Sequence, residues 1–302
     1  MTSQLLADGE TGFDLTLHFS LADRHARGRV VRLGPVLDEI LAAHAYPAPI
    51  LHLLAEALTL TALLGALLKD SASQLTMQAQ TEAGAVELLV CDYRGGELRG
   101  YVRHDAAKLS ELGANPSLFA LFGRGYLAIT FDLAASGQRY QGIVPLEGDS
   151  LAGACESYFG QSEQVPTLIR VAVRSSSTGC VAGGLLVQHL AEGEEGRERL
   201  HVRLDHPEWE HVAALAGSVS HDELVDPALG LETIVWRLFH EEREVRVARG
   251  APLTRGCRCS VEHYREVIAR FPADEREAMR GNDGQITVDC AFCSKAFAIE
   301  LG

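Results

Sequence analysis

The sequence predicts an α+β protein in three parts: a mixed domain of helices and sheet over residues 1–199, a helical linker region over 200–250, and a small four-cysteine domain over 251–302. Three observations lead to this division. The first part shows both the two-residue period of strands and the 3.6-residue period of helices. The second part is strongly acidic. The third contains four of the seven cysteines.

Strand patterns recur through the first part. Leu75, Met77 and Ala79 alternate with polar residues, which indicates a half-buried strand. Further strand-like stretches lie at residues 126–131, 142–144 and 168–173, and Gly95-Gly96 predicts a turn. We therefore expect a sheet of several short strands.

Two helices stand out in this part. Asp149-Ser150 is a good N-cap, and apolar residues then repeat at i, i+3, i+4, i+7 and i+8: Leu151, Ala154, Cys155, Tyr158 and Phe159. Cys155 should therefore be a small buried core residue. The apolar run 50–68 is long enough to span a membrane, but it contains His52 and Glu56, so we expect a buried core helix and no membrane association.

The second part begins with a loop-like acidic stretch, 192–196, and residues 192–250 contain 14 acidic and seven basic residues. Its best helical pattern is an apolar stripe opposite charged residues; the stripe consists of Leu231, Ile234, Val235, Leu238 and Phe239. A stripe this short is stable only when it docks on another element. Two interpretations remain: a helical subdomain packed permanently against the first part, or a linker that acts as a detachable latch.

The net charge and the N-terminal sequence limit the functions and locations that are possible for this protein. The formal net charge of -14 disfavours nucleic-acid binding, which needs a basic face. Asp8, Glu10 and Asp14 interrupt any apolar leader, so we expect no signal peptide. The chain is predicted to be cytoplasmic, where clustered cysteines usually indicate metal or redox chemistry.

The cysteines of the third part form a CxC (Cys257, Cys259) and a CxxC (Cys290, Cys293) separated by 30 residues. Zinc prefers four tetrahedral ligands, and four thiolates make a closed structural site. The spacing therefore predicts one Zn²⁺ per chain in the reduced form. His263 is a further ligand type nearby, but the four cysteines already complete the shell.

The sequence between the two pairs predicts a small folded unit. Its expected elements are a helical face formed by Val261, Tyr264, Ile268 and Phe271, a turn at 282–284 and a strand at 286–288. About 50 residues bury too little surface to be stable alone, so we expect folding to depend on the metal.

Whether the metal site is permanent or switchable is open from the residues alone. A permanent structural zinc site is the simpler interpretation. However, four thiolates on Zn²⁺ leave a charge of -2, and each close pair is able to form a local disulfide on oxidation. Arg255, Arg258 and Lys295 are near enough in sequence to offset the charge.

These motifs resemble the 33 kDa heat shock protein family of redox-regulated holdase chaperones. The resemblance covers nearly the whole chain and rests first on the CxC and CxxC with their 30-residue gap. It also rests on upstream stretches that follow one another in the same order as in the family: 125–130, 140–144, 146–150, 158–159, 162–167 and 235–242. The chain departs from the family in an acidic insert-like loop at Glu192–Arg199 and in ending nine residues after Cys293.

The resemblance implies an ATP-independent chaperone, not an enzyme, that binds unfolding client proteins and is a homodimer when active. It implies that peroxide forms the disulfides Cys257–Cys259 and Cys290–Cys293, releases zinc, unfolds the switch and undocks the linker. The chain accordingly has no G-x-x-x-x-G-K-[ST] phosphate loop. Cys91, Cys155 and Cys180 are expected to be dispensable for switching.

Two alternatives belong to other functional classes. A zinc-dependent nucleic-acid-binding regulator would use the closed thiolate site, but the net charge of -14 opposes it. A thiol–disulfide oxidoreductase would use a CxxC cysteine at a helix start, with a lowered pKa. Here the CxxC lies between strand-like segments, and neither the 175–177 serine run nor the scattered histidines form a recognisable triad.

Overall fold

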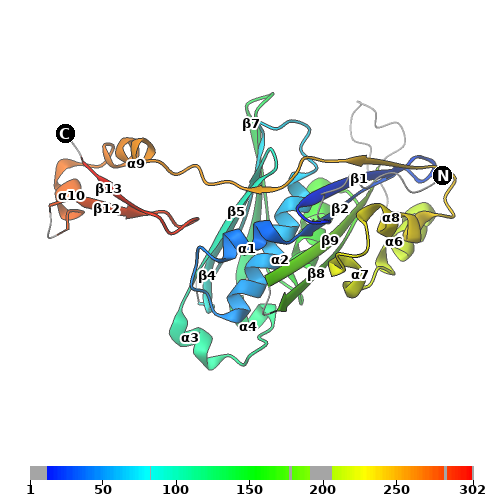
Figure 1. The fold of residues 1–302 in the computed structure, drawn as a ribbon, viewed down its shortest axis with the longest axis horizontal. Helices are drawn as coiled ribbons and strands as arrows, with labels where there is room; N and C mark the ends of the chain where they lie inside the picture. Colours follow the sequence, from blue (N-terminus) through cyan, green and yellow to red (C-terminus); the bar gives the residue numbers. More distant parts are fainter. Residues whose placement is uncertain (1–11, 82, 177–178, 191–205, 282–283, 301–302) are drawn as a thin grey trace.

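Two sheets form the body of the computed structural model, which describes residues 12–81, 83–176, 179–190, 206–281 and 284–300 (Figure 1). The five-stranded sheet has the order β10-β1-β2-β9-β8, and the six-stranded sheet has the order β11-β5-β4-β3-β6-β7. Neighbouring strands are antiparallel, except that β11 is parallel to β5. The strands are β1 Leu15–Leu21, β2 Ala26–Leu33, β3 Gln74–Thr81, β4 Val86–Arg94, β5 Glu97–His104, β6 Gly125–Leu133, β7 Gln138–Pro145, β8 Thr167–Ser176, β9 Gly179–His189, β10 Val245–Arg249 and β11 Thr254–Arg255.

Helix α2 (Ala48–Gly65) fills the space between the two sheets and contacts strands of both. It is long and apolar enough to cross a membrane, but 72% of its apolar window is buried inside the protein, so it is a core helix as predicted. Its two buried threonines are satisfied within the helix, because the Thr59 and Thr61 hydroxyls donate to the Ala55 and Ala57 carbonyls at 2.8 and 2.7 Å. The main hydrophobic core surrounds this helix.

The predicted strands and turn of the first part are confirmed. Side chains of β3 alternate between buried and half-buried, as Leu75, Met77 and Ala79 require. Gly95 and Gly96 form the β4–β5 turn with φ of 57° and 94°, a region that favours glycine. The sequence therefore identified this part of the sheet correctly.

The helix predicted after Asp149-Ser150 is α5 (Leu151–Tyr158), capped by the Ser150 hydroxyl. It ends one residue before the predicted stripe does, because Phe159 begins a π-helical turn, η2 (Phe159–Glu163). Cys155 is completely buried, as expected. The remaining helices of this part are short: η1 Ala22–Arg24, α1 Pro35–Leu41, α3 Ala106–Glu111 and α4 Leu118–Phe122.

Three helices of the acidic segment cover the other face of the five-stranded sheet: α6 Pro207–Gly217, α7 His221–Val225 and α8 Leu231–Phe239 (Figure 1). Successive strand side chains point to opposite faces. On β9, Leu186 accordingly packs in the core around α2, whereas Leu185 and Val187 pack with the three helices. The five-stranded sheet therefore lies between two separate cores.

The C-terminal unit lies at one end of the molecule, beyond the body (Figure 1). It consists of α9 Val261–Ile268, α10 Ala273–Ala278 and a hairpin of β12 Ile286–Asp289 and β13 Ala296–Ile299. Among its described residues, the buried aliphatic core is Ile268, Ile286 and Ile299. The predicted strand is confirmed, but Phe271 lies beyond the end of α9 and is 39% exposed, so its assignment to the packed face was wrong.

Two predicted features cannot be compared with the structure. The acidic loop at 192–196 and residues 282–283 of the predicted turn lie outside the described residues. Gly284, the last turn residue, has a φ of 75°.

Candidate metal centre

The four C-terminal cysteines converge on one point, although 30 residues separate the two pairs. Their four sulfurs all lie within 4.8 Å of one another. The Cys257 sulfur is 3.2 Å from that of Cys259 and 3.6 Å from that of Cys290, and the Cys259 sulfur is 3.5 Å from that of Cys293. All seven cysteines of the chain are free thiols.

Local backbone structure directs each pair toward this point. The CxC follows β11 and precedes Ser260, whose hydroxyl caps α9. The CxxC forms a tight turn between β12 and β13: the amides of Cys293 and Ser294 donate to the Cys290 carbonyl at 3.3 and 2.8 Å. Ser294 adopts a left-handed φ of 56°, which closes the turn.

The thiols of the cluster differ in acidity. Burial acts to raise the pKa of Cys290, but hydrogen bonds from the Tyr264 hydroxyl and from the Phe292 and Cys293 amides lower it to about 6. Burial raises the pKa of Cys259 and of Cys293. The pKa of Cys290 is therefore below those of Cys259 and Cys293, and Tyr264 has a role that the sequence pattern did not reveal.

The donor set fits a zinc ion. In a tetrahedral site with zinc–sulfur bonds of about 2.3 Å, the sulfurs are about 3.8 Å apart, close to the separations found here. Cys290 and Cys293 are buried and the other two are half-buried, so the cluster is largely shielded from water. Four convergent thiols form a closed set with no position left for a substrate.

The cluster is also attached to the six-stranded sheet. Phe292, inside the CxxC, packs edge-on against Tyr101 with ring centroids 4.9 Å apart. The guanidinium carbon of Arg99 lies 4.0 Å from the centroid of the same ring. Arg258, between the CxC cysteines, donates to the Gln74 side chain at 2.8 Å. These three contacts join the C-terminal unit to the body.

Known proteins resemble the chain along nearly its whole length. The sequence model described as Hsp33 protein matches residues 14–300. The 33 kDa chaperonin of Caulobacter vibrioides is 40% identical over 295 residues, covering 95% of each chain. That of Ectopseudomonas mendocina is 36% identical, covering 95% of this chain and 92% of the relative.

The chain belongs to the Hsp33 family. The resemblance predicted from the sequence is therefore confirmed. A crystal structure of the 33 kDa chaperonin of Thermotoga maritima has the same fold, with a TM-score of 0.75, 21% identity and coverage of 95% of this chain and 94% of that one.

The other cysteines of this Hsp33 family member lie apart from the cluster. Cys91 and Cys155 are completely buried, and Cys180 is 7% exposed. Burial raises the pKa of all three thiols. They are therefore protonated at neutral pH and poorly placed to react with an oxidant.

The apolar stripe of α8 faces the five-stranded sheet. Leu231, Ile234, Val235 and Phe239 are buried, and Leu238 is half-buried at its edge. Phe239 is completely buried and packs on Phe19 of β1, with ring centroids 5.3 Å apart.

A buried arginine that sequence reasoning missed also ties this segment to the Hsp33 core. Arg32 of β2 donates to the backbone carbonyls of Leu224, Leu229 and Glu223 at 3.0, 2.7 and 3.1 Å. The backbone of α7 also lies very close to β9, because a Cβ at Gly183 of β9 would be only 2.1 Å from the Leu224 carbonyl oxygen of α7. A lone arginine in a strand pattern carries no sequence signal for such a partner.

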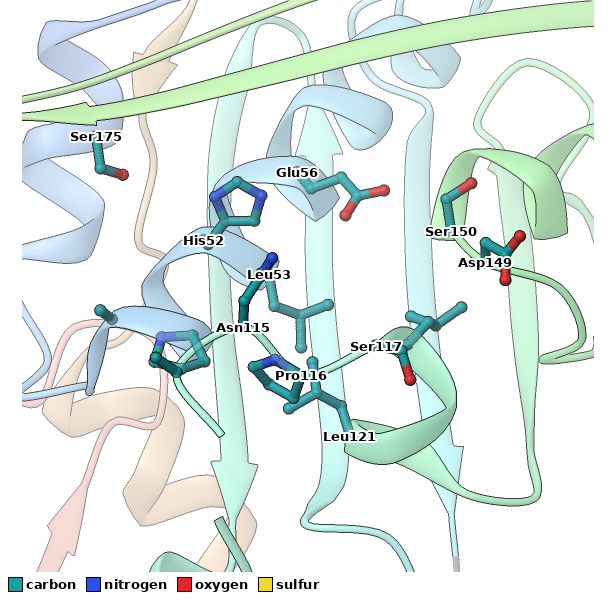
Figure 2. Close-up of a pocket in the computed structure, with 14 residues that line it drawn as sticks. His52, Leu53, Glu56, Asn115, Pro116, Ser117, Leu121, Asp149, Ser150 and Ser175 are labelled. Carbon is teal, nitrogen blue, oxygen red and sulfur yellow. The ribbon is translucent and has the colours of Figure 1, made fainter. Parts of the chain in front are cut away.

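A cavity of about 540 Å³ lies beside α2, lined by residues that include His52, Glu56, Ser150 and Ser175 (Figure 2). Burial raises the pKa of Glu56, which accepts hydrogen bonds from the backbone amides of Ala152 and Leu151 and so caps α5. The Ser175 hydroxyl contacts the Cys180 sulfur at 3.6 Å. Among the described lining residues no histidine is hydrogen-bonded to a serine, so we place the functional site at the cysteines.

Proposed function

We propose that this protein is a redox-regulated, ATP-independent holdase that binds unfolding proteins in the cytoplasm under oxidative stress. The observation that carries the proposal is the convergence of four thiols in a unit whose described aliphatic core has three buried residues. Membership in the Hsp33 family supports the chaperone assignment. In this proposal residues 1–199 bind clients and form the dimer, 200–250 are the latch, and 251–302 are the switch.

The reduced switch would hold one zinc ion through Cys257, Cys259, Cys290 and Cys293. Zinc bound to small domains contributes about 10–16 kcal/mol of apparent binding free energy, most of it coupled to folding. With so small an aliphatic core, the unit depends on this contribution. Loss of the four ligands would therefore unfold it.

Oxidation would remove the ligands in two equivalent steps. In each step two thiols lose two electrons and two protons to one peroxide molecule, which becomes two water molecules, and one sulfur–sulfur bond forms. We propose the pairs Cys257–Cys259 and Cys290–Cys293, because each is close in sequence and closes a short loop. Sulfurs paired with one another no longer ligate zinc.

The latch would then respond to the loss of the switch. Moving a two-state element from about 1:99 to 99:1 takes about 5.5 kcal/mol, less than the metal site contributes. Helices α6–α8 pack on one face of the five-stranded sheet. Their release would uncover apolar side chains, including Phe19 and Leu185, to which clients would bind.

The alternatives have less support. Cys290 lies at the end of β12, not at a helix N-terminus, which does not favour a thiol–disulfide oxidoreductase. The net charge of -14 does not favour a nucleic-acid-binding regulator, and the apolar α2 is buried, which does not favour membrane association.

One experiment tests the proposal directly. Bound zinc and suppression of aggregation of a thermally unfolding enzyme are measured before and after peroxide treatment, without ATP. We expect one zinc and little suppression in the reduced form, and no zinc and strong suppression in the oxidised form. Equal suppression in both forms would refute redox regulation, and no suppression in either would refute the holdase assignment.

A further inference from the structure

A second group of metal-ligand side chains lies where the five-stranded sheet meets the first linker helix. His189 is the last residue of β9, His206 is the N-cap of α6, and Glu208 is in the first turn of α6. One donor atom from each lies within 4.8 Å of the others. These residues lie on other elements than the cysteine cluster and are not ligands of the zinc switch proposed above.

His189 is the central member of this group. Its side chain is 3% exposed, and neither ring nitrogen has a hydrogen-bond partner among the described residues. The Arg24 carbonyl lies near the ring, but without hydrogen-bond geometry. An unsatisfied buried polar group costs about 1–3 kcal/mol, so an unpartnered buried ring needs an explanation.

The surroundings keep this ring in the form that binds metals. Burial, together with the nearby His206 and His25, lowers the pKa of His189, while Glu208 and the Arg24 carbonyl act in the opposite direction. A neutral imidazole has a nitrogen lone pair available to an ion. The ring is also held in place, because it stacks on Trp209 with centroids 6.2 Å apart and lies 5.1 Å from the ring of His206.

The other two side chains are half-buried and able to adjust. His206 accepts a hydrogen bond at Nδ1 from the Glu208 amide at 3.3 Å, a long capping contact. An ion would take this lone pair, and loss of such a cap typically costs about 1 kcal/mol. Donors around a tetrahedral ion at about 2.1 Å are about 3.4 Å apart, so modest rotation of these two side chains completes the site.

We propose that His189, His206 and Glu208 form a second metal site, which binds a divalent transition-metal ion such as Zn²⁺. Two imidazoles and one carboxylate suit zinc and its neighbours, whereas Mg²⁺ and Ca²⁺ prefer oxygen ligands alone. Three protein ligands leave a coordination position open to water, so this site is more exchangeable than the four-thiolate cluster.

The ion would join two separate elements of the fold at this point. It would connect the end of β9 to the first turn of α6, and so it would favour the docked form of the linker segment. An ion that binds only the docked form, at ten times its dissociation constant, lowers the undocked fraction about tenfold. The metal site itself does not depend on the chaperone assignment.

The test uses the full-length reduced protein with its cysteine site already loaded, titrated with Zn²⁺ and followed by calorimetry and metal analysis. We expect a second zinc per chain in the wild type. We expect it to be lost in His206→Asn, which keeps a residue able to cap α6, and in Glu208→Gln. His221→Asn, an exposed histidine at the start of α7, serves as the control and should retain it.

Protection of α6 from proteolysis provides a second readout that is independent of chaperone activity. Added Zn²⁺ should slow cleavage within 206–217 about tenfold in the wild type and in His221→Asn, but not in His206→Asn or Glu208→Gln. A wild-type chain that saturates at one zinc would overturn the site. So would a second zinc that both ligand variants retain.

Discussion

The guanidinium of Arg99 lies over the ring of Phe292, a residue inside the CxxC, with the guanidinium carbon 4.0 Å from the ring centroid. Asp92 holds this arginine in place through a 2.6 Å ion pair with its Nη2 and is 4% exposed. The Phe292 ring therefore contributes to the position of the cysteine turn on the six-stranded sheet, together with the hydrogen bond from Arg258 to Gln74.

The first prediction concerns this ring. Phe292→Ala removes an aromatic pair and a cation–π contact, which together are worth about 1–2 kcal/mol. We expect unchanged zinc content in the reduced chain and about tenfold faster protease cleavage near residues 250–256. Phe271→Ala is the matched control, because Phe271 is an exposed aromatic of the same unit. Equal cleavage rates for the two variants would contradict the docking role.

The second prediction tests the ligand set. Cys290→Ser removes one of the four thiols, so zinc retention, measured by competition with a chelator, should fall by at least tenfold. Replacing Cys91, Cys155 and Cys180 with Ala is the control; these buried thiols should be dispensable for zinc retention and for the response to peroxide. Unchanged zinc affinity in Cys290→Ser would exclude this set of ligands.

The third prediction concerns acidity. Tyr264→Phe removes the hydroxyl that helps to lower the pKa of Cys290 to about 6 but keeps the aromatic ring beside Phe297. Because zinc binds the thiolate, a higher thiol pKa lets protons displace the metal at higher pH. The midpoint of zinc release on acidification should rise by up to about one pH unit. His263→Asn should leave it unchanged, and an unshifted midpoint in Tyr264→Phe would show that the hydroxyl has no influence.

The fourth prediction tests the latch. Phe239→Ala empties a fully buried site, a change that typically costs about 3–5 kcal/mol. The reduced variant should suppress client aggregation without oxidant while it retains zinc. Trp236→Ala is the control, because this side chain lies on the same helix and is 64% exposed. If α8 is shown to undock in Phe239→Ala and chaperone activity does not increase, the latch hypothesis is wrong. The segment would then be only a spacer.

The fifth prediction concerns the buried arginine. Arg32→Met leaves three backbone carbonyls of the α7 region without their donor, at about 1–3 kcal/mol each. Hydrogen exchange of α7 amides should accelerate at least tenfold, while exchange in β3 and β4 should not change. Arg29→Met, from the same strand, removes a bond to the Ala66 carbonyl on the other side of the sheet and should not affect α7.

Local elements were predictable from the sequence because each depends on nearby residues. The Ser150 cap, the alternation in β3 and the Gly95-Gly96 turn are local signals, and all three appear in the structure. The cysteine cluster was predictable for a different reason: the ligand preference of zinc links two short motifs across any intervening sequence.

Contacts between distant segments were not predictable. Nothing near Arg32 in the sequence indicates that it donates to carbonyls about 190 residues away. Arg258 donates to Gln74 of β3, 184 residues away, and the residues around it in the sequence do not indicate this partner. The end of α5 was missed because apolar spacing does not distinguish an α-turn from the π-turn at Phe159.

The pairing of β1 with β10 has a consequence for synthesis on the ribosome. His18 lies opposite Ala248, and the Thr16 hydroxyl donates to the Ala251 carbonyl across 235 residues. At about 5–20 residues per second, β1 is made roughly 10–45 s before its outer partner. During translation β1 is therefore an edge strand with open backbone donors and acceptors. Each newly made chain thus passes through an intermediate in which the outer side of β1 is unpaired until β10 has been made.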